Sequence, residues 1–106
     1  MITFEEFKKL DIRAARVIEA ERIEGSEQLL KPLIDLGEEK RQIISGIAKF
    51  YQPENLIGKE IIVLVNLEPK FFFGLESQGM LLAVDIEKGC VLLEPDKKVS
   101  PGSKVT

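Results

Sequence analysis

The sequence predicts an all-β domain with little helix, built as a five-stranded barrel with a C-terminal extension. Short apolar segments recur along the chain at regular spacing, and turns rich in Gly, Pro and charged residues separate them. Many short strands spaced in this way are typical of small barrels. The chain has 106 residues, of which 44% are hydrophobic, and this suits a single domain over residues 1–106 with one core.

The first half of the chain predicts one short helix and three strands. Thr3 and Glu6 have the S/T-x-x-E spacing of a capping box, which predicts a helix over residues 4–9. Apolar residues at 10, 12, 14, 18 and 20 then share one phase of period two, which is the signal of a half-buried strand. The predicted strands span 10–23, 29–36 and 42–45. A charged turn at 37–40 joins the last two as a hairpin.

The second half predicts another short helix and the rest of the barrel. Pro53 and Gly58 bracket the expected helix, because Pro favours a helix start and Gly a helix end. Residues 59–67 are nearly all apolar and predict a fourth strand buried on both faces, followed by a loop at 68–74. The remaining expected strand pairings are at 80–84, 90–94 and 103–105. A helix between the third and fourth strands is the arrangement of an OB-fold barrel.

The composition disfavours an enzyme. The chain contains no histidine, which removes the commonest general base, the commonest metal ligand and the usual partner of a nucleophilic Ser or Cys. It has neither a P-loop nor a G-x-G-x-x-G motif. The single cysteine, Cys90, cannot form an internal disulfide or a thiolate cluster. We therefore expect a non-catalytic binding module without cofactor or metal.

The charge of the chain and the absence of targeting signals limit the kinds of partner that we expect. No segment approaches the ~20 apolar residues that cross a bilayer, and the N-terminus has no signal-peptide pattern. We therefore expect a cytoplasmic protein that makes no membrane contact. The net charge is −3 and the pI is near 5.1, so nucleic-acid binding requires a local basic patch on an acidic molecule.

Five segments resemble the tRNA-binding domain found at the C-terminus of many methionyl-tRNA synthetases and in a free-standing, dimeric, structure-specific tRNA-binding protein. They cover nearly the whole chain in order, at 7–13, 23–31, 35–41, 44–48 and 66–80. The most distinctive stretch is Glu-Ser-Gln-Gly-Met at 76–80, with Asn-Leu-x-Pro upstream. The resemblance implies an OB-type barrel with a C-terminal extension that recognises the corner of tRNA by its shape.

The resemblance also implies an RNA-binding surface of cations and hydrogen-bonding side chains. Folded RNA is read through phosphates, 2′-hydroxyls and unstacked bases. The candidate RNA-binding residues at or beside the matched positions are Lys31, Arg41, Lys49, Asn66, Lys70, Ser77, Gln78 and Met80. Each has a structural alternative: the cations face water, Asn66 caps a turn, Ser77 and Gln78 fix loop backbone, and Met80 fills the core.

Two features depart from the family pattern. The loop before Gly74 is usually rich in Lys and Arg, whereas Lys70 is its only cation here. The three phenylalanines at 71–73 could stack on bases, although we expect at least two of them to fill the core or a dimer seam. Pro32 cannot donate to a β-ladder, so it predicts a strand start or an edge beside Lys31. Modest, salt-sensitive RNA affinity is the expected consequence.

Two functions remain open from the sequence. The first is a homodimeric tRNA-binding protein that acts with methionyl-tRNA synthetase or as its separate subunit, and the start at Met1 favours a complete small protein. The second is a dimeric, chaperone-like protein-binding module on the same fold, since a related secretion-chaperone family resembles this domain. The Ser-Gln-Gly-Met pattern favours the first function, whereas the acidic pI and the three phenylalanines favour the second.

Overall fold

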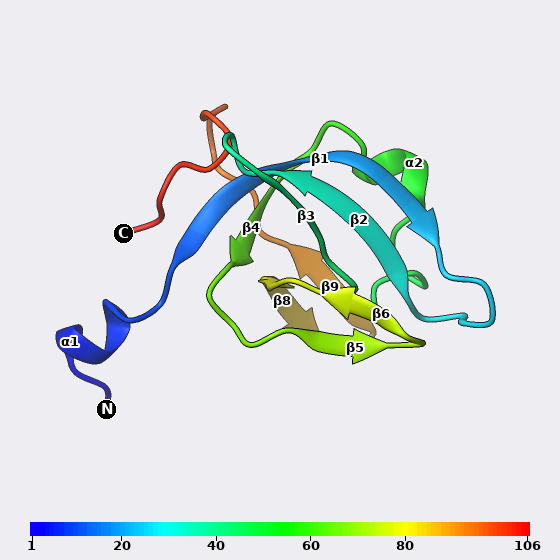
Figure 1. Ribbon diagram of the computed structural model, residues 1–106, viewed down its shortest axis with the longest axis horizontal. Helices are drawn as coiled ribbons and strands as arrows, with labels where there is room; N and C mark the ends of the chain where they lie inside the picture. Colours follow the sequence, from blue (N-terminus) through cyan, green and yellow to red (C-terminus); the bar gives the residue numbers. More distant parts are fainter.

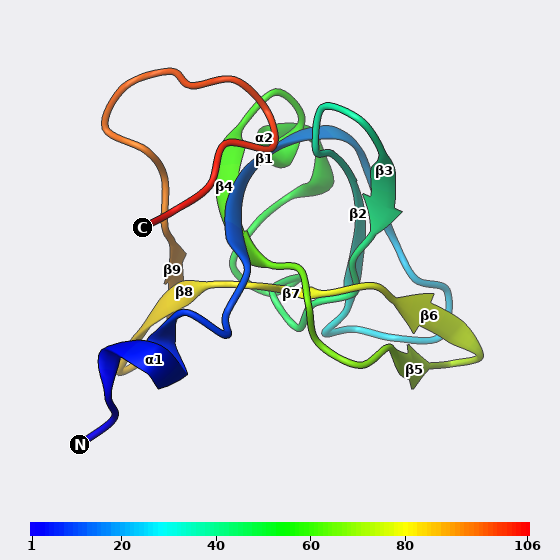
Figure 2. The same cartoon turned by 60° about the vertical axis from the view of Figure 1, so that its left-hand side comes forward.

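A curled five-stranded sheet forms most of the molecule (Figure 1). The computed structural model describes residues 1–106. Every neighbouring pair in the sheet is antiparallel, in the order β3-β2-β1-β4-β7. Its strands are β1 (Ile12–Arg22), β2 (Leu30–Asp35), β3 (Lys40–Gln42), β4 (Glu60–Leu64) and β7 (Met80–Leu81). Figure 2 looks into the curl of this sheet, whose two edges are β3 and β7.

Two short helices and two small hairpins complete the fold. Their bounds are α1 (Phe4–Phe7), α2 (Pro53–Leu56), β5 (Lys70–Phe72) with β6 (Leu75–Ser77), and β8 (Ala83–Ile86) with β9 (Gly89–Leu92). The predicted helix between the third and fourth strands is confirmed, because α2 follows β3 and precedes β4. The capping box is also confirmed, since Thr3 and Glu6 each accept a hydrogen bond from the other's backbone. Neither helix has the length and apolar content needed to cross a membrane.

β1 holds the molecule together because it has three pairing partners. Its first half pairs with β4 and its second half with β2, and the register shifts between Val17 and Glu19. Such an irregularity bends a strand and increases its twist. The C-terminal tail pairs beside Ile12–Ala14: Val105 N–H donates to Ile12 O at 2.8 Å, and Ala14 N–H donates to Ser103 O at 2.9 Å. The predicted pairing at 103–105 is therefore confirmed.

The alternation of β2 sets the inside and outside of the barrel. Leu30, Pro32 and Ile34 are buried, whereas the residues between them are only half-buried. The prediction that Pro32 marks a strand start or edge is wrong, because β2 lies between β1 and β3. Pro32 O accepts from Ile43 N–H at 3.0 Å, just beyond the end of β3. The regular pairing of β2 with β3 ends at Leu33 and Gln42, one residue short of Pro32. Because no regular ladder bond is needed from the Pro32 nitrogen, its missing N–H is tolerated.

The predicted loop at 68–74 is wrong, because much of it belongs to the β5–β6 hairpin. Lys70 pairs with Ser77 and Phe72 pairs with Leu75, which leaves Phe73-Gly74 as the turn. Other boundaries shift as well. The third strand is at 40–42 rather than 42–45, with an isolated bridge from Ser45 to Leu30. The predicted strand at 80–84 is divided between β7 and the start of β8.

Candidate nucleic-acid interface

In OB-folds, nucleic acids bind on the outer face of the second and third strands, between the loop joining strands one and two and the loop joining strands four and five. Here that face is the outside of β2 and β3. The first loop is residues 23–29, and the second is residues 65–79, which contain the β5–β6 hairpin. We call this surface the β2–β3 face.

Lys31 lies on the β2–β3 face beside an acidic partner. Lys31 is opposite Glu21 in the β1–β2 register, and its Nζ lies 2.6 Å from Glu21 Oε1. Both side chains line a shallow hollow that Leu33 and Gln42 also line. Lys31 thus lies on this face, and its charge is paired with the carboxylate of Glu21.

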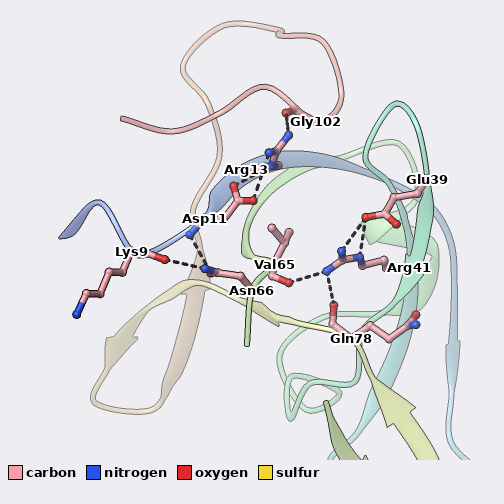
Figure 3. A network of polar contacts seen from close by, with 9 residues as sticks. All are labelled: Lys9, Asp11, Arg13, Glu39, Arg41, Val65, Asn66, Gln78 and Gly102. Atoms are coloured by element: carbon pink, nitrogen blue, oxygen red, sulfur yellow. Dashed lines mark hydrogen bonds and ion pairs between the residues drawn. The ribbon is translucent and has the colours of Figure 1, made fainter. Parts of the chain in front are cut away.

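Arg41 joins β3 to the opposite edge of the barrel. Its guanidinium donates to Val65 O at 2.6 Å and to Gln78 O at 3.4 Å. It also forms an ion pair with Glu39, with Nη2 2.7 Å from Oε1 (Figure 3). The charge of Arg41 is therefore shared between two carbonyl groups and a carboxylate, and its side chain is fixed.

Asn66 fastens the N-terminal segment to the end of β4. Its Nδ2 donates to Lys9 O at 2.6 Å, and its Oδ1 accepts from Asp11 N–H at 2.8 Å (Figure 3). Both the nitrogen and the oxygen of the Asn66 amide therefore bond backbone groups of the segment that precedes β1. Asn66 thus holds a distant segment in place, whereas the structural alternative expected it to cap a turn.

Asp11 and Arg13 form an ion pair beside this anchor. Arg13 Nε lies 2.8 Å from Asp11 Oδ1, and Arg13 Nη1 donates to Gly102 O at 3.2 Å. The hydrogen bond from Arg13 lowers the pKa of Asp11, against an opposing effect of burial. The same bond raises the pKa of Arg13. The pair thus joins the start of β1 to the C-terminal tail.

Ser77 and Gln78 close the gap between the two edge strands. Ser77 is only 3% exposed; its Oγ accepts from Ile44 N–H at 2.9 Å and donates to Gly79 O at 3.0 Å. Gln78 N–H donates to Gln42 O at 2.8 Å, and Gln78 Oε1 accepts from Gln42 N–H at 3.1 Å. These contacts replace the strand pairing that β3 and β7 do not make with each other.

The β5–β6 hairpin carries the most exposed candidate groups. Phe71 and Phe73 are each 65% exposed, whereas Phe72 is half-buried under Lys70, whose Nζ lies 5.2 Å from the ring centroid. Phe71 and Phe73 therefore do not fill the core of this chain, because Phe71 is exposed on β5 and Phe73 lies in the turn. A place for these rings in a dimer seam stays a prediction.

The remaining two candidates are also exposed. Met80 is 49% exposed on β7, so it does not fill the core. Lys49 is exposed in the segment between β3 and α2 and belongs to none of the four ion pairs. The side chains of Met80 and Lys49 are therefore accessible from solvent.

A comparison with known protein families shows to which family this chain belongs. The family model described as "Putative tRNA binding domain" matches residues 12–104. This chain belongs to the tRNA-binding domain family. The family is defined by tRNA binding and not by catalysis.

The sequence of this tRNA-binding domain is similar to parts of methionine–tRNA ligases. It is 56% identical over 102 residues to the methionine–tRNA ligase of Methanothrix thermoacetophila and 52% identical over 104 residues to that of Archaeoglobus fulgidus. The matches cover 96% and 98% of this chain, but only 15% and 16% of the two relatives. The chain thus spans a small part of the length of these ligases.

Solved structures share the complete fold. A MetRS-related protein from Pyrococcus horikoshii superposes with a TM-score of 0.94 at 39% identity, covering 100% of this chain and 98% of that one. The chaperone CsaA from Bacillus anthracis superposes with a TM-score of 0.92 at 35% identity, covering 100% and 99%. The predicted OB-type, all-β fold is confirmed.

The candidate residues of this tRNA-binding domain fall into three groups. Arg41, Asn66, Ser77 and Gln78 come together around the barrel closure and the N-terminal anchor, where they bond backbone. Lys31 and Lys70 lie on the β2–β3 face and its hairpin, and Lys49 and Met80 are exposed outside these contacts. The RNA-binding role of all eight remains a prediction.

Sequence reasoning missed Gln42 and the two acidic partners, Glu21 and Glu39. Gln42 bonds Gln78 and Glu76 O, and it lies opposite Leu33 on the β2–β3 face. The charged stretch 37–40 indicated a turn, so the edge strand was predicted at 42–45 and not at 40–42. Lys40, Arg41 and Gln42 are all polar, so the apolar alternation that marks a half-buried strand is missing here.

Proposed function

We propose that this chain binds tRNA by its shape, at the corner of the folded molecule, through the β2–β3 face and the β5–β6 hairpin. The observation that carries the proposal is the hairpin, which presents Lys70 and exposed aromatic rings beside the ligand face of an OB-fold in a member of the tRNA-binding family. Cations, donors and aromatic faces are the groups that folded RNA and its unstacked bases require.

The charges of this surface indicate modest affinity. Lys31 is paired with Glu21 and Arg41 with Glu39, so a phosphate must compete with carboxylates for two of the cations. Lys70 is free of ion pairs and lies over Phe72. Each phosphate contact contributes about 0.7–0.9 to the slope of log K against log salt, and with so few unpaired cations we expect a shallow slope. Recognition then depends on fit more than on charge.

We further propose that the chain works as a homodimer, in the cytoplasm, with or as a separate subunit of methionyl-tRNA synthetase. Val84, Ile86, Val91 and Leu93 leave the β8–β9 hairpin with an exposed apolar surface. A second copy of the chain would cover such a surface. Two weak RNA sites in one particle bind a tRNA more tightly than either does alone. Sedimentation as a monomer of 11.9 kDa at micromolar concentration would contradict the dimer.

The direct test is a gel shift with unfractionated tRNA at low and physiological salt. Lys70→Glu is compared with Lys97→Glu, because both place the same charge change on an exposed lysine. We expect Lys70→Glu to weaken binding clearly and to lower the salt slope by about 0.7–0.9, whereas Lys97→Glu changes little. Equal effects of the two substitutions, or no binding by the wild type, would contradict the proposal.

One observation favours a second candidate function. The chaperone CsaA structures from Bacillus anthracis and Picrophilus torridus both superpose with TM-scores of 0.92, at 35% and 30% identity. A dimeric, chaperone-like protein-binding module is therefore the alternative. It predicts that an unfolded polypeptide binds at the exposed apolar side chains and that Lys70→Glu leaves this binding unchanged. Suppression of aggregation of a denatured test protein, with no shift of tRNA, would establish this alternative.

A further inference from the structure

The turn of the β5–β6 hairpin contains a residue that the turn itself disfavours. Phe72 pairs with Leu75, so the loop has two residues, Phe73 and Gly74. Both have positive φ, 51° and 77°, which is the signature of a type I′ turn. The first position of such a turn favours Asn, Asp or Gly, because a bulky side chain is strained at positive φ. Phe73 is the only non-glycine residue of the chain with this backbone conformation.

The strain at Phe73 is not offset by packing of its ring into the core. It is 65% exposed and absent from the core cluster. It lies next to the loop between β1 and β2, where a Cβ on Gly25 would be 3.9 Å from Phe73 Cε1. Gly25 has no side chain to cover the ring, which is exposed beside the first of the two OB-fold ligand loops. Strain retained without a packing benefit is typical of functional positions.

The surroundings of the ring favour RNA over other ligands. Lys70 lies on the same hairpin, with its Nζ over Phe72, and can meet a phosphate. Gln42 bonds Glu76 O and so ties the hairpin to the β2–β3 face. An aromatic face next to a cation and a row of polar groups suits a base attached to its phosphate.

We infer that Phe73 is a stacking platform for one unstacked base of the bound tRNA. This inference rests on the proposed function and goes further, because it names the chemical group recognised and the residue that recognises it. Stacking on an aromatic ring tolerates any base, since every base has a π-face. The contact therefore adds affinity for an exposed loop base without selecting one tRNA sequence.

A single tryptophan tests the contact directly, because the chain contains no Trp. Phe73→Trp places a fluorescent ring at the turn, and Phe4→Trp is its control, since Phe4 is 69% exposed on α1. Figures 1 and 2 show α1 and the β5–β6 hairpin on opposite sides of the molecule. Addition of unfractionated tRNA should quench Trp at 73 and leave Trp at 4 unchanged. If the Phe73→Trp protein shifts tRNA in a gel without a change in fluorescence, the stacking inference is overturned while the proposed function stands.

Affinity measurements supply the second test. Phe73→Asn puts the favoured residue into the turn, so the melting temperature should stay the same or rise, while tRNA affinity falls about 5- to 150-fold, the range for one lost stacked base. Phe73→Leu should lose about as much, because it keeps apolar volume but no π-face. Phe73→Tyr should retain wild-type affinity. The salt slope should not change in any of these variants, since the ring contacts no phosphate.

Each other outcome has a definite meaning. Full affinity in Phe73→Asn or Phe73→Leu overturns the stacking platform. Reduced, carboxymethylated α-lactalbumin serves as an unfolded polypeptide in a parallel binding assay. If the Phe73 variants lose binding of this polypeptide but keep tRNA binding, the ring contacts polypeptides and the stacking inference is overturned. Failure of the wild type to bind tRNA at any salt concentration rejects the proposed function itself, which the fluorescence result alone cannot do.

Discussion

Gln78 occupies the place of a missing strand opposite Gln42. Its backbone N–H donates to Gln42 O at 2.8 Å, and its side-chain Oε1, in place of a backbone carbonyl, accepts from Gln42 N–H at 3.1 Å. Gln78 thereby connects β3 to the segment that leads into β7. Arg41 adds a second connection across the same gap, to Val65 O. The most distinctive motif of the chain thus closes the barrel on which the proposed RNA surface is built.

We predict that Gln78→Ala loosens this closure. Gln42 N–H loses its acceptor in a half-buried place, so the free energy of unfolding should fall by about 1–2 kcal/mol. Urea unfolding measures the loss, and hydrogen exchange should accelerate at Gln42. The matched control is Gln52→Ala, because the Gln52 side chain accepts only an exposed bond from Arg22. An equal fall in the free energy of unfolding of both variants would contradict a stabilising role for the bond between Gln78 and Gln42.

Gly79→Ala should be much more destabilising than Gly46→Ala. Gly79 has a φ of 134°, and a Cβ there would lie 2.8 Å from Leu64 O, whereas Gly46 has open space and no positive φ. We expect a loss of about 2–4 kcal/mol at Gly79 and less than about 1 kcal/mol, of either sign, at Gly46. Thermal unfolding of the two variants makes the comparison, and a similar melting temperature for both would contradict the close packing at Gly79.

Asn66→Ala should release the N-terminal segment without unfolding the barrel. The two bonds of the side chain reach Lys9 O and Asp11 N–H. Their loss should cost about 1–2 kcal/mol and speed proteolysis before residue 12. Asn55→Ala is the control, since Asn55 is exposed in α2 and its side chain makes no hydrogen bond. If Asn66→Ala weakens tRNA binding while proteolysis is unchanged, Asn66 contacts RNA directly.

The ion pair of Asp11 and Arg13 should make stability depend on pH in the acidic range. The pKa of Asp11 is lowered from 3.8 by the hydrogen bond from Arg13. A lowered folded-state pKa gives a stabilisation that is complete above the unfolded-state value and is lost as pH falls through the folded-state value. Asp11→Asn should therefore reduce stability at pH 7 and flatten its decline below about pH 4.

The control for this pH dependence is Asp96→Asn, because Asp96 is exposed and belongs to none of the ion pairs. Unfolding by urea at pH 7 and pH 3 gives the two free energies for each variant. The account fails if Asp11→Asn and the wild type lose the same stability between the two pH values.

The sequence predicted the barrel because its signals are local. The strand predicted at 29–36, the capping box at Thr3 and the Pro53 helix start each depend on neighbouring residues. All three are confirmed, with the strand at Leu30–Asp35. The β5–β6 hairpin was missed because its strands have three residues each and its turn has Phe73 at the position where a two-residue hairpin usually has Asn, Asp or Gly.

The site was less predictable because its contacts join distant parts of the chain. Asn66 bonds a carbonyl 57 residues away, and Arg41 bonds one 24 residues away. A polar residue in a loop looks the same in sequence whether it binds RNA or its own backbone. The same holds for Glu21, whose pairing with Lys31 depends on the strand register. Only a structure separates the side chains that hold the barrel from those that remain free.

Amide chemical-shift mapping of the ¹⁵N-labelled chain with unfractionated tRNA tests the central claim most directly. We predict that shifts concentrate at Lys31, Gln42 and residues 70–74, with little change on α1 and the β8–β9 hairpin. Shifts confined to α1, β8 and β9, with the β2–β3 face silent, would contradict the account.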